Sequence, residues 1–101
     1  MNQIERITEM EKTMDEVTAI VAEMKTALEK FRKVQERLHR VEKYYGSSVW
    51  FEDADADRHG RLPENLKCEV LANESVWKLL IENRELAIQM LETGTDIIKN
   101  K

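Results

Sequence analysis

The sequence has few of the residues that make tight turns, with three glycines and one proline in 101 residues. Because sandwiches and barrels need many such turns, this scarcity argues against an all-β architecture. The only cysteine is Cys68, so an intramolecular disulfide is impossible and a reducing compartment is expected. The longest strongly apolar stretch, at residues 76–81, is interrupted by Lys78. It is far shorter than the roughly 20 residues of a membrane span.

The sequence also lacks a strong excess of charge of either sign, since the formal net charge is −4. This balance gives no general reason to expect binding to nucleic acid or to a membrane surface. The first residues, Met1-Asn2-Gln3-Ile4, have neither the basic start nor the apolar core of a signal peptide. We therefore expect a cytoplasmic protein that does not associate with membranes.

Residues 2–45 contain neither glycine nor proline and are rich in helix-forming residues, which predicts one long helix. Its apolar positions alternate in steps of three and four, which is the heptad pattern of a coiled coil. These positions, which we call the seam, are Ile7, Met10, Met14, Val17, Val21, Met24, Leu28 and Phe31. The phase slips after Phe31, where Gln35 takes the next seam position. Such a slip can bend or overwind a coiled coil near Phe31.

Gly46 is expected to end this helix in a left-handed conformation, and Ser47 or Ser48 to cap a short helix over residues 48–58. Residues 61–65 include Pro63 and are expected to form a loop. Asn73 or Ser75 would cap a last helix over residues 74–92, which Gly94 interrupts and which could extend to residue 99. The predicted fold is therefore all-α: one domain over residues 1–101, forming a helical bundle or coiled-coil-like assembly.

One segment suggests a family. The segment Tyr44-Tyr45-Gly46-Ser47-Ser48-Val49-Trp50-Phe51-Glu52-Asp53, together with the later Gly60-Arg61-Leu62-Pro63, resembles a family of short bacterial proteins. That family is catalogued as a domain of unknown function, number 4298. The resemblance implies a small helical cytoplasmic protein of bacteria and implies no activity. The sequence departs from the family pattern at Glu69, where a glycine is usual, and at residues 72–74, where the last helix begins.

An acidic segment follows the aromatic residues. Asp53, Asp55, Asp57 and Glu64 fall at positions 1, 3, 5 and 12 of a calcium-binding EF-hand loop. Position 6 of that loop needs glycine for its sharp turn, and Arg58 stands there. We therefore predict no metal site and no cofactor. A calcium-type regulatory protein using the Asp53–Glu64 segment remains an alternative.

Residues suited to catalysis are few. His59 lies near these aspartates, but the only other histidine, His39, belongs to the long helix, and one histidine does not make a zinc site. Cys68 could act as a nucleophile only with a base beside it, and it sits between Leu66 and Val70, as a small buried apolar residue would. We expect no catalytic residues and no enzymatic activity.

Five of the six aromatic residues cluster in the sequence around the turns between helices. We predict that they pack a structural joint, because a small domain needs large side chains to supply its core. The joint residues predicted are Tyr44, Tyr45, Trp50 and Trp77, with Phe51 beside them.

Charge is divided along the long helix. Residues 1–24 hold six acidic and two basic residues, whereas residues 25–45 hold seven basic and three acidic ones. The basic half leaves a nucleic-acid accessory role open as an alternative, although Glu29, Glu36 and Glu42 interrupt it.

The interpretation we favour is a protein-interaction or structural module that forms a homodimer through the long helix. The predicted contact residues are Met10, Met14, Val17, Val21, Met24, Leu28 and Phe31. The charge division favours an antiparallel pair centred near Val21, and a further, unidentified protein partner is possible.

Overall fold

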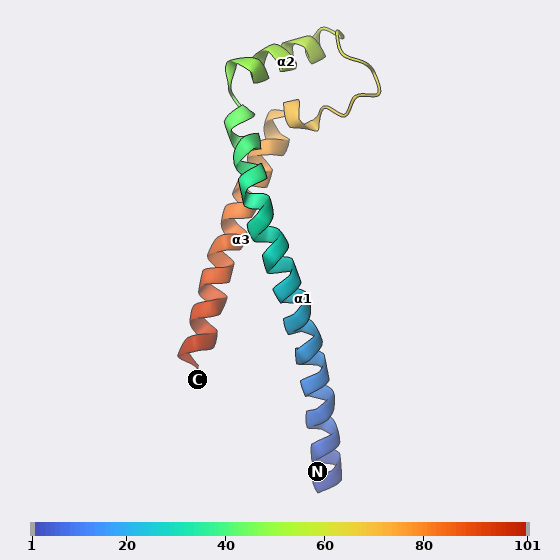
Figure 1. Cartoon of the computed structure of the whole chain (residues 1–101), viewed down its shortest axis with the longest axis vertical. Coiled ribbons are helices and arrows are strands. Elements are labelled where there is room, and N and C mark those ends of the chain that lie inside the picture. The colour runs from blue at the N-terminus through green and yellow to red at the C-terminus, as the bar shows by residue number, and fades with distance from the viewer. Residues whose placement is uncertain (1, 101) are drawn as a thin grey trace. The chain divides into compact units, whose positions relative to one another are not determined.

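The structure is a computed structural model that describes residues 2–100. Its helices are α1 (Gln3–Tyr44), α2 (Ser48–Arg58) and α3 (Asn73–Lys99), with a 3₁₀ turn, η1 (Glu69–Leu71), before α3 (Figure 1). No strand occurs within these residues. The predicted all-α class, with a long first helix, a short second helix and a C-terminal helix, is confirmed.

Helix α1 begins at a side-chain cap. The Oδ1 of Asn2 accepts a 2.8 Å hydrogen bond from the backbone N–H of Glu5, and the Asn2 amide donates to the Glu5 carboxylate at 2.9 Å. This reciprocal pair satisfies one of the free N–H groups at the helix start. From there α1 continues without a break through Phe31 to Tyr44 (Figure 1).

Gly46 turns the chain out of α1. Its φ of +79° lies in the left-handed region that glycine adopts without a steric penalty. Ser47 then caps α2, because its Oγ accepts a 3.2 Å hydrogen bond from the backbone N–H of Trp50. The expected glycine turn and serine cap are therefore both present.

A loop connects α2 to η1. Gly60, with a φ of +66°, ends the turn after α2, and residues 61–68 contain no helix. The loop closes with η1, in which the N–H of Leu71 donates to the Cys68 carbonyl at 2.9 Å. η1 contacts both α2 and α3 and was not predicted from the sequence.

Helix α3 differs from its prediction in its N-cap and at Gly94, and it takes the longer of the two expected extents, to Lys99. It begins at Asn73, and the capping residue is Ala72, whose side chain makes no capping bond. The Asn73 side chain instead accepts a hydrogen bond from the hydroxyl of Tyr45. Gly94 was expected to interrupt the helix, but α3 runs through it to Lys99. A single glycine in a helix costs only about 1 kcal/mol, which flanking helix formers can offset.

The chain divides into two compact units, the first ending at Leu38 and the second beginning at His39. Within the described residues the buried hydrophobic side chains are Trp50 and Val76, both in the second unit. The core of that unit therefore lies where α2, η1 and the start of α3 meet. No helix in residues 2–100 is long and apolar enough to cross a membrane.

Candidate interaction surface and aromatic joint

The N-terminal half of α1 carries a continuous row of exposed apolar side chains. The large apolar residues from Ile4 to Met24 are 51 to 77% exposed. They are Ile4, Ile7, Met10, Met14, Val17, Ile20, Val21 and Met24. Soluble proteins rarely leave so continuous an apolar row open to water unless it is a binding surface. The predicted contact residues Leu28 and Phe31, by contrast, are half-buried.

This row follows the heptad seam along one side of α1. With Val21 at heptad position a, Ile20 and Ala27 flank the seam on one side at position g. Glu11, Lys25 and Arg32 flank it on the other side, at position e. From Ile20 toward the C-terminus, one flank of the seam is therefore apolar and the other charged.

The aromatic joint lies in the second unit and is organised by Trp50. The indole is 7% exposed, and its Nε1–H donates a 2.9 Å hydrogen bond to the carbonyl of Val70. Tyr45 and Phe51 both meet the indole edge to face, with ring centres 5.2 and 5.0 Å away. Trp50 thus connects the start of α2 to η1 through a hydrogen bond and packs against Tyr45 and Phe51.

Trp77, also predicted at the joint, stands apart from this cluster. It is 61% exposed, and with Tyr45, Asn73 and Glu74 it lines a shallow hollow on the surface. Its side chain therefore adds little to the buried core.

A second polar link connects the end of α1 to α2. The Tyr44 hydroxyl donates a 2.5 Å hydrogen bond to Oδ2 of Asp53. This hydrogen bond, with partial burial and the negative charge of Asp53, raises the pKa of Tyr44 to about 12. Tyr44 therefore stays protonated as a donor throughout the physiological range.

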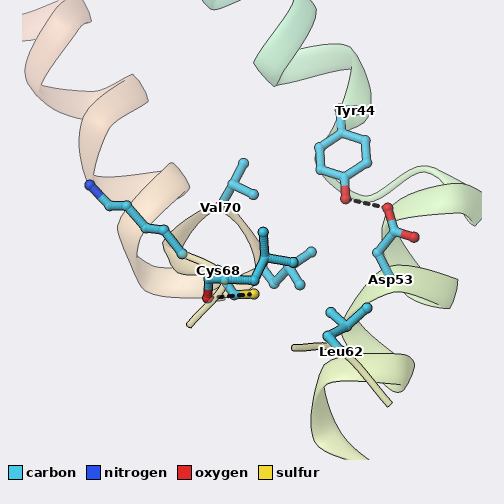
Figure 2. Close-up of a pocket in the computed structure, with 8 residues that line it drawn as sticks. Tyr44, Asp53, Leu62, Cys68 and Val70 are labelled. Carbon is cyan, nitrogen blue, oxygen red and sulfur yellow. Dashed lines mark hydrogen bonds between the residues drawn. The ribbon is translucent and has the colours of Figure 1, made fainter. Parts of the chain in front are cut away.

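Tyr44 and Asp53 form one wall of a pocket of about 290 Å³. Figure 2 shows the two side chains facing each other, with Leu62 below Asp53 and with Cys68 and Val70 across the pocket. The other residues lining it are Leu66, Lys67 and Leu71. Its walls are thus mostly aliphatic, and Tyr44, Asp53 and Cys68 are already hydrogen-bonded to neighbours.

The Cys68 thiol donates a 3.4 Å hydrogen bond to the carbonyl of Leu66. Partial burial and the nearby Asp57 carboxylate raise the pKa of Cys68. Since the thiolate is the reactive form of cysteine, these surroundings make Cys68 a weaker nucleophile.

The structure does not bring the four acidic residues of the candidate calcium loop together. Asp53, Asp55 and Asp57 belong to helix α2, whereas Glu64 follows in the loop. Residues two apart in a helix point about 200° apart, so the three carboxylates cannot surround one ion as they do in an EF-hand loop.

The three aspartates also have different neighbours. Asp53 accepts from Tyr44, and Asp57 lies beside Cys68. Asp55 pairs with Arg61 at 2.9 Å and with Arg58 at 3.4 Å. Among the described residues no group of three or more histidine, cysteine or acidic side chains is placed to hold a metal ion.

His59 is the C-cap of α2 and interacts with Asp55 in the preceding turn. Its Nδ1 lies 2.8 Å from the Asp55 carbonyl and 3.3 Å from the Asp55 carboxylate. Its side chain is more than half exposed and does not line the pocket that contains Tyr44 and Cys68. This arrangement stabilises the end of the helix and brings no base to Cys68.

The basic residues of α1 are spread around the helix. Lys25 and Arg32 lie beside the seam, whereas Lys33 and Arg40 share heptad position f on the opposite side. Glu29 and Glu36 each lie four residues before a basic residue, as in helix-stabilising pairs. The basic half therefore does not form one continuous cationic stripe.

Two hydrogen bonds of the joint, Tyr44–Asp53 and Trp50–Val70, were not predicted from the sequence. The first joins residues nine apart across a turn, and the second joins residues twenty apart. Neither the heptad pattern nor the turn residues predict which residues form these two hydrogen bonds. The one usable clue was that a buried tyrosine or tryptophan must find a partner for its polar atom.

Comparison with known proteins gives one match. The family described as "Domain of unknown function (DUF4298)" matches residues 7–93. No curated protein and no solved structure matches this chain. The matched range contains the whole seam and the whole aromatic joint.

Proposed function

We propose that this chain, which belongs to the DUF4298 family, is a protein-interaction module without catalytic activity. The description of the family names no activity. The working surface of the module is the seam of α1, and the chain that occupies this surface is a second copy of the protein. The observation that carries the proposal is the row of eight large apolar side chains, from Ile4 to Met24, that are each more than half exposed.

The length of the seam supports pairing with another helix. The exposed row covers 21 residues, or roughly 30 Å of helix at 1.5 Å per residue. Three heptads of apolar positions are about the least that sustains a coiled coil. Covering this surface removes eight apolar side chains per copy from water, and such burial is the main force in association.

A second copy fits the surface better than a nucleic acid does. The exposed apolar row lies in the acidic half of α1, which would repel phosphate groups. The two halves of α1 carry opposite net charge, so each copy offers the complement of the other's surface. We place this dimer in the bacterial cytoplasm, in keeping with the one free cysteine.

The pocket beside Tyr44 supports a structural role better than a catalytic one. Asp53 raises the pKa of Tyr44, and partial burial together with Asp57 raises the pKa of the Cys68 thiol. Both shifts favour the protonated side chain, whereas a nucleophile acts in its deprotonated form. These contacts instead hold the end of α1, α2 and η1 together.

Sedimentation equilibrium of the full chain tests the proposal. We expect a dimer at micromolar concentration, and we expect Val21→Glu to dissociate it, because the substitution places a carboxylate within the apolar seam. Ala22→Glu is the matched control: it adds the same charge one residue away, at an outward heptad position, and should leave the dimer intact. A wild-type chain that stays monomeric, or a dimer that both variants weaken equally, would refute the proposal.

A further inference from the structure

We infer that the two copies of α1 pair in antiparallel orientation, with the acidic half of each helix lying along the basic half of the other. This inference rests on the proposed dimer and specifies its orientation and register. It follows from three observations on α1: the apolar seam that continues from Ile7 to Phe31, the charge of the two halves of the helix, and the difference in charge between the flanks of the seam.

The exposed row lies toward one end of the helix. The large apolar side chains are more than half exposed from Ile4 to Met24, whereas Leu28 and Phe31 are half-buried. The apolar pattern itself continues to Phe31. The seam is therefore apolar on both sides of Val21, and in an antiparallel pair its positions from Met14 to Phe31 lie opposite one another.

The charges select this orientation. Residues 2–24 carry six acidic and two basic side chains, and residues 25–45 carry seven basic and three acidic ones. A parallel pair would place two acidic halves together and two basic halves together. An antiparallel pair centred between Val21 and Met24 places each acidic half against a basic half, so that electrostatic repulsion becomes attraction.

The register follows from the heptad positions. In an antiparallel coiled coil, a residues of one helix meet d residues of the other, so Val21 meets Met24 of the second copy and Met14 meets Phe31 of the second copy. All four of these positions are apolar.

The flanks agree with the same register. On the charged flank Glu11 faces Arg32 of the second copy, an attractive pair that occurs twice in the dimer. On the apolar flank Ile20 faces Ala27 of the second copy, which widens the apolar contact. No like-charged pair is brought together on either flank.

A charge exchange between Glu11 and Arg32 tests the orientation. The two residues are 21 positions apart, or roughly 30 Å along one helix, so they cannot interact within a chain or in a parallel dimer. We expect Glu11→Arg and Arg32→Glu each to raise the dimer Kd by roughly 2- to 30-fold, the range that corresponds to two exposed ion pairs. The double variant should return the Kd to within about threefold of wild type.

The matched control pairs Glu11→Arg with Lys33→Glu. This double variant has the same net charge as Glu11→Arg with Arg32→Glu. Lys33, however, lies on the side of the helix away from the seam. It should therefore not rescue the Kd, and equal rescue by both double variants would mean that only net charge matters and would overturn the inference.

Crosslinking gives an independent measure of orientation. In a Cys68→Ser background, a cysteine introduced by Val21→Cys should crosslink to its copy through a short bifunctional maleimide, whereas Gln3→Cys should not. A dimer that crosslinks at both positions and shows no coupling between Glu11 and Arg32 is parallel. That result would overturn the orientation and leave the dimer standing. A chain that is monomeric in every experiment would overturn the proposed function itself.

Discussion

Single residues decide the stability of the second unit, because so few of its side chains are buried. Trp50 and Val76 are the buried hydrophobic residues of the described chain, and the Trp50 indole also donates a hydrogen bond to Val70. Removing a side chain of this kind leaves a cavity and an unsatisfied carbonyl. In a unit with so small a core, few other contacts can compensate.

Trp50→Ala should therefore lower the free energy of unfolding by about 3–5 kcal/mol, as large-to-small changes of buried aromatic residues do. The matched control is Trp77→Ala, since Trp77 is 61% exposed and its loss should change stability by no more than about 0.5 kcal/mol. Urea unfolding followed by circular dichroism measures both. Equal effects of the two substitutions would show that Trp50 does not organise the joint.

The hydrogen bond from Tyr44 to Asp53 predicts a dependence of stability on pH. The bond raises the pKa of Tyr44 from its ordinary value of 10.0 to about 12. The stabilisation is therefore complete below about pH 10 and is lost as the pH rises through about 12. Tyr44→Phe should lower the free energy of unfolding by about 1 kcal/mol at neutral pH, the typical contribution of one hydrogen bond.

The difference between wild type and Tyr44→Phe should shrink as the pH approaches 12. Tyr45→Phe serves as the control, because it removes the other tyrosine and leaves the Tyr44–Asp53 bond in place. Ultraviolet titration of this variant observes Tyr44 alone. A midpoint near pH 10 would contradict the raised pKa of Tyr44 and the hydrogen bond that causes it.

At the scale of helices and turns, the sequence predicts the structure well wherever the signal is local. The heptad pattern predicts α1 to within a residue at each end, and Gly46 with Ser47 predicts the break before α2. These features depend on neighbouring residues alone. The predicted interruption at Gly94 was wrong, because strong helix-forming residues on both sides can offset the cost of one glycine.

What could not be predicted depends on residues distant in the sequence. η1 is held between α2 and α3, and the Tyr45 hydroxyl engages Asn73 in place of a helix cap. The Asp53–Glu64 segment matched a loop pattern in spacing, yet its first residues form a helix. Helix propensity together with the Ser47 cap therefore outweighed the resemblance to a calcium loop.

The two glycines at 46 and 94 predict opposite effects of alanine. Gly46 has a φ of +79°, so Gly46→Ala should destabilise the protein by about 1 kcal/mol. Gly94 lies within α3 with nothing within 4 Å of an added methyl group, so Gly94→Ala should stabilise it by up to about 1 kcal/mol. Thermal unfolding compares the two variants directly. Destabilisation by Gly94→Ala would mean that a partner approaches α3 closely at that point.

At the scale of the whole molecule, two kinds of stability have to be separated. The contacts of Trp50 act within one chain, whereas the α1 seam is proposed to act between two chains. A 101-residue chain with two buried hydrophobic residues among those described has a small core of its own. Much of its stability should therefore depend on the dimer, and hence on protein concentration.

If the chain is stabilised by dimerisation, its Tm should rise with protein concentration. Each tenfold increase in concentration favours a dimer by about 1.4 kcal/mol, which for two chains of this size should raise the Tm by roughly 3–6 °C. Val21→Glu should abolish this dependence, whereas Trp50→Ala should lower the Tm at every concentration and leave the slope unchanged. The slope of Tm against concentration therefore measures association through the seam. The Tm at a given concentration measures the stability that the joint contributes. A wild-type Tm that does not change with concentration would show that the stability of the chain arises within a single copy.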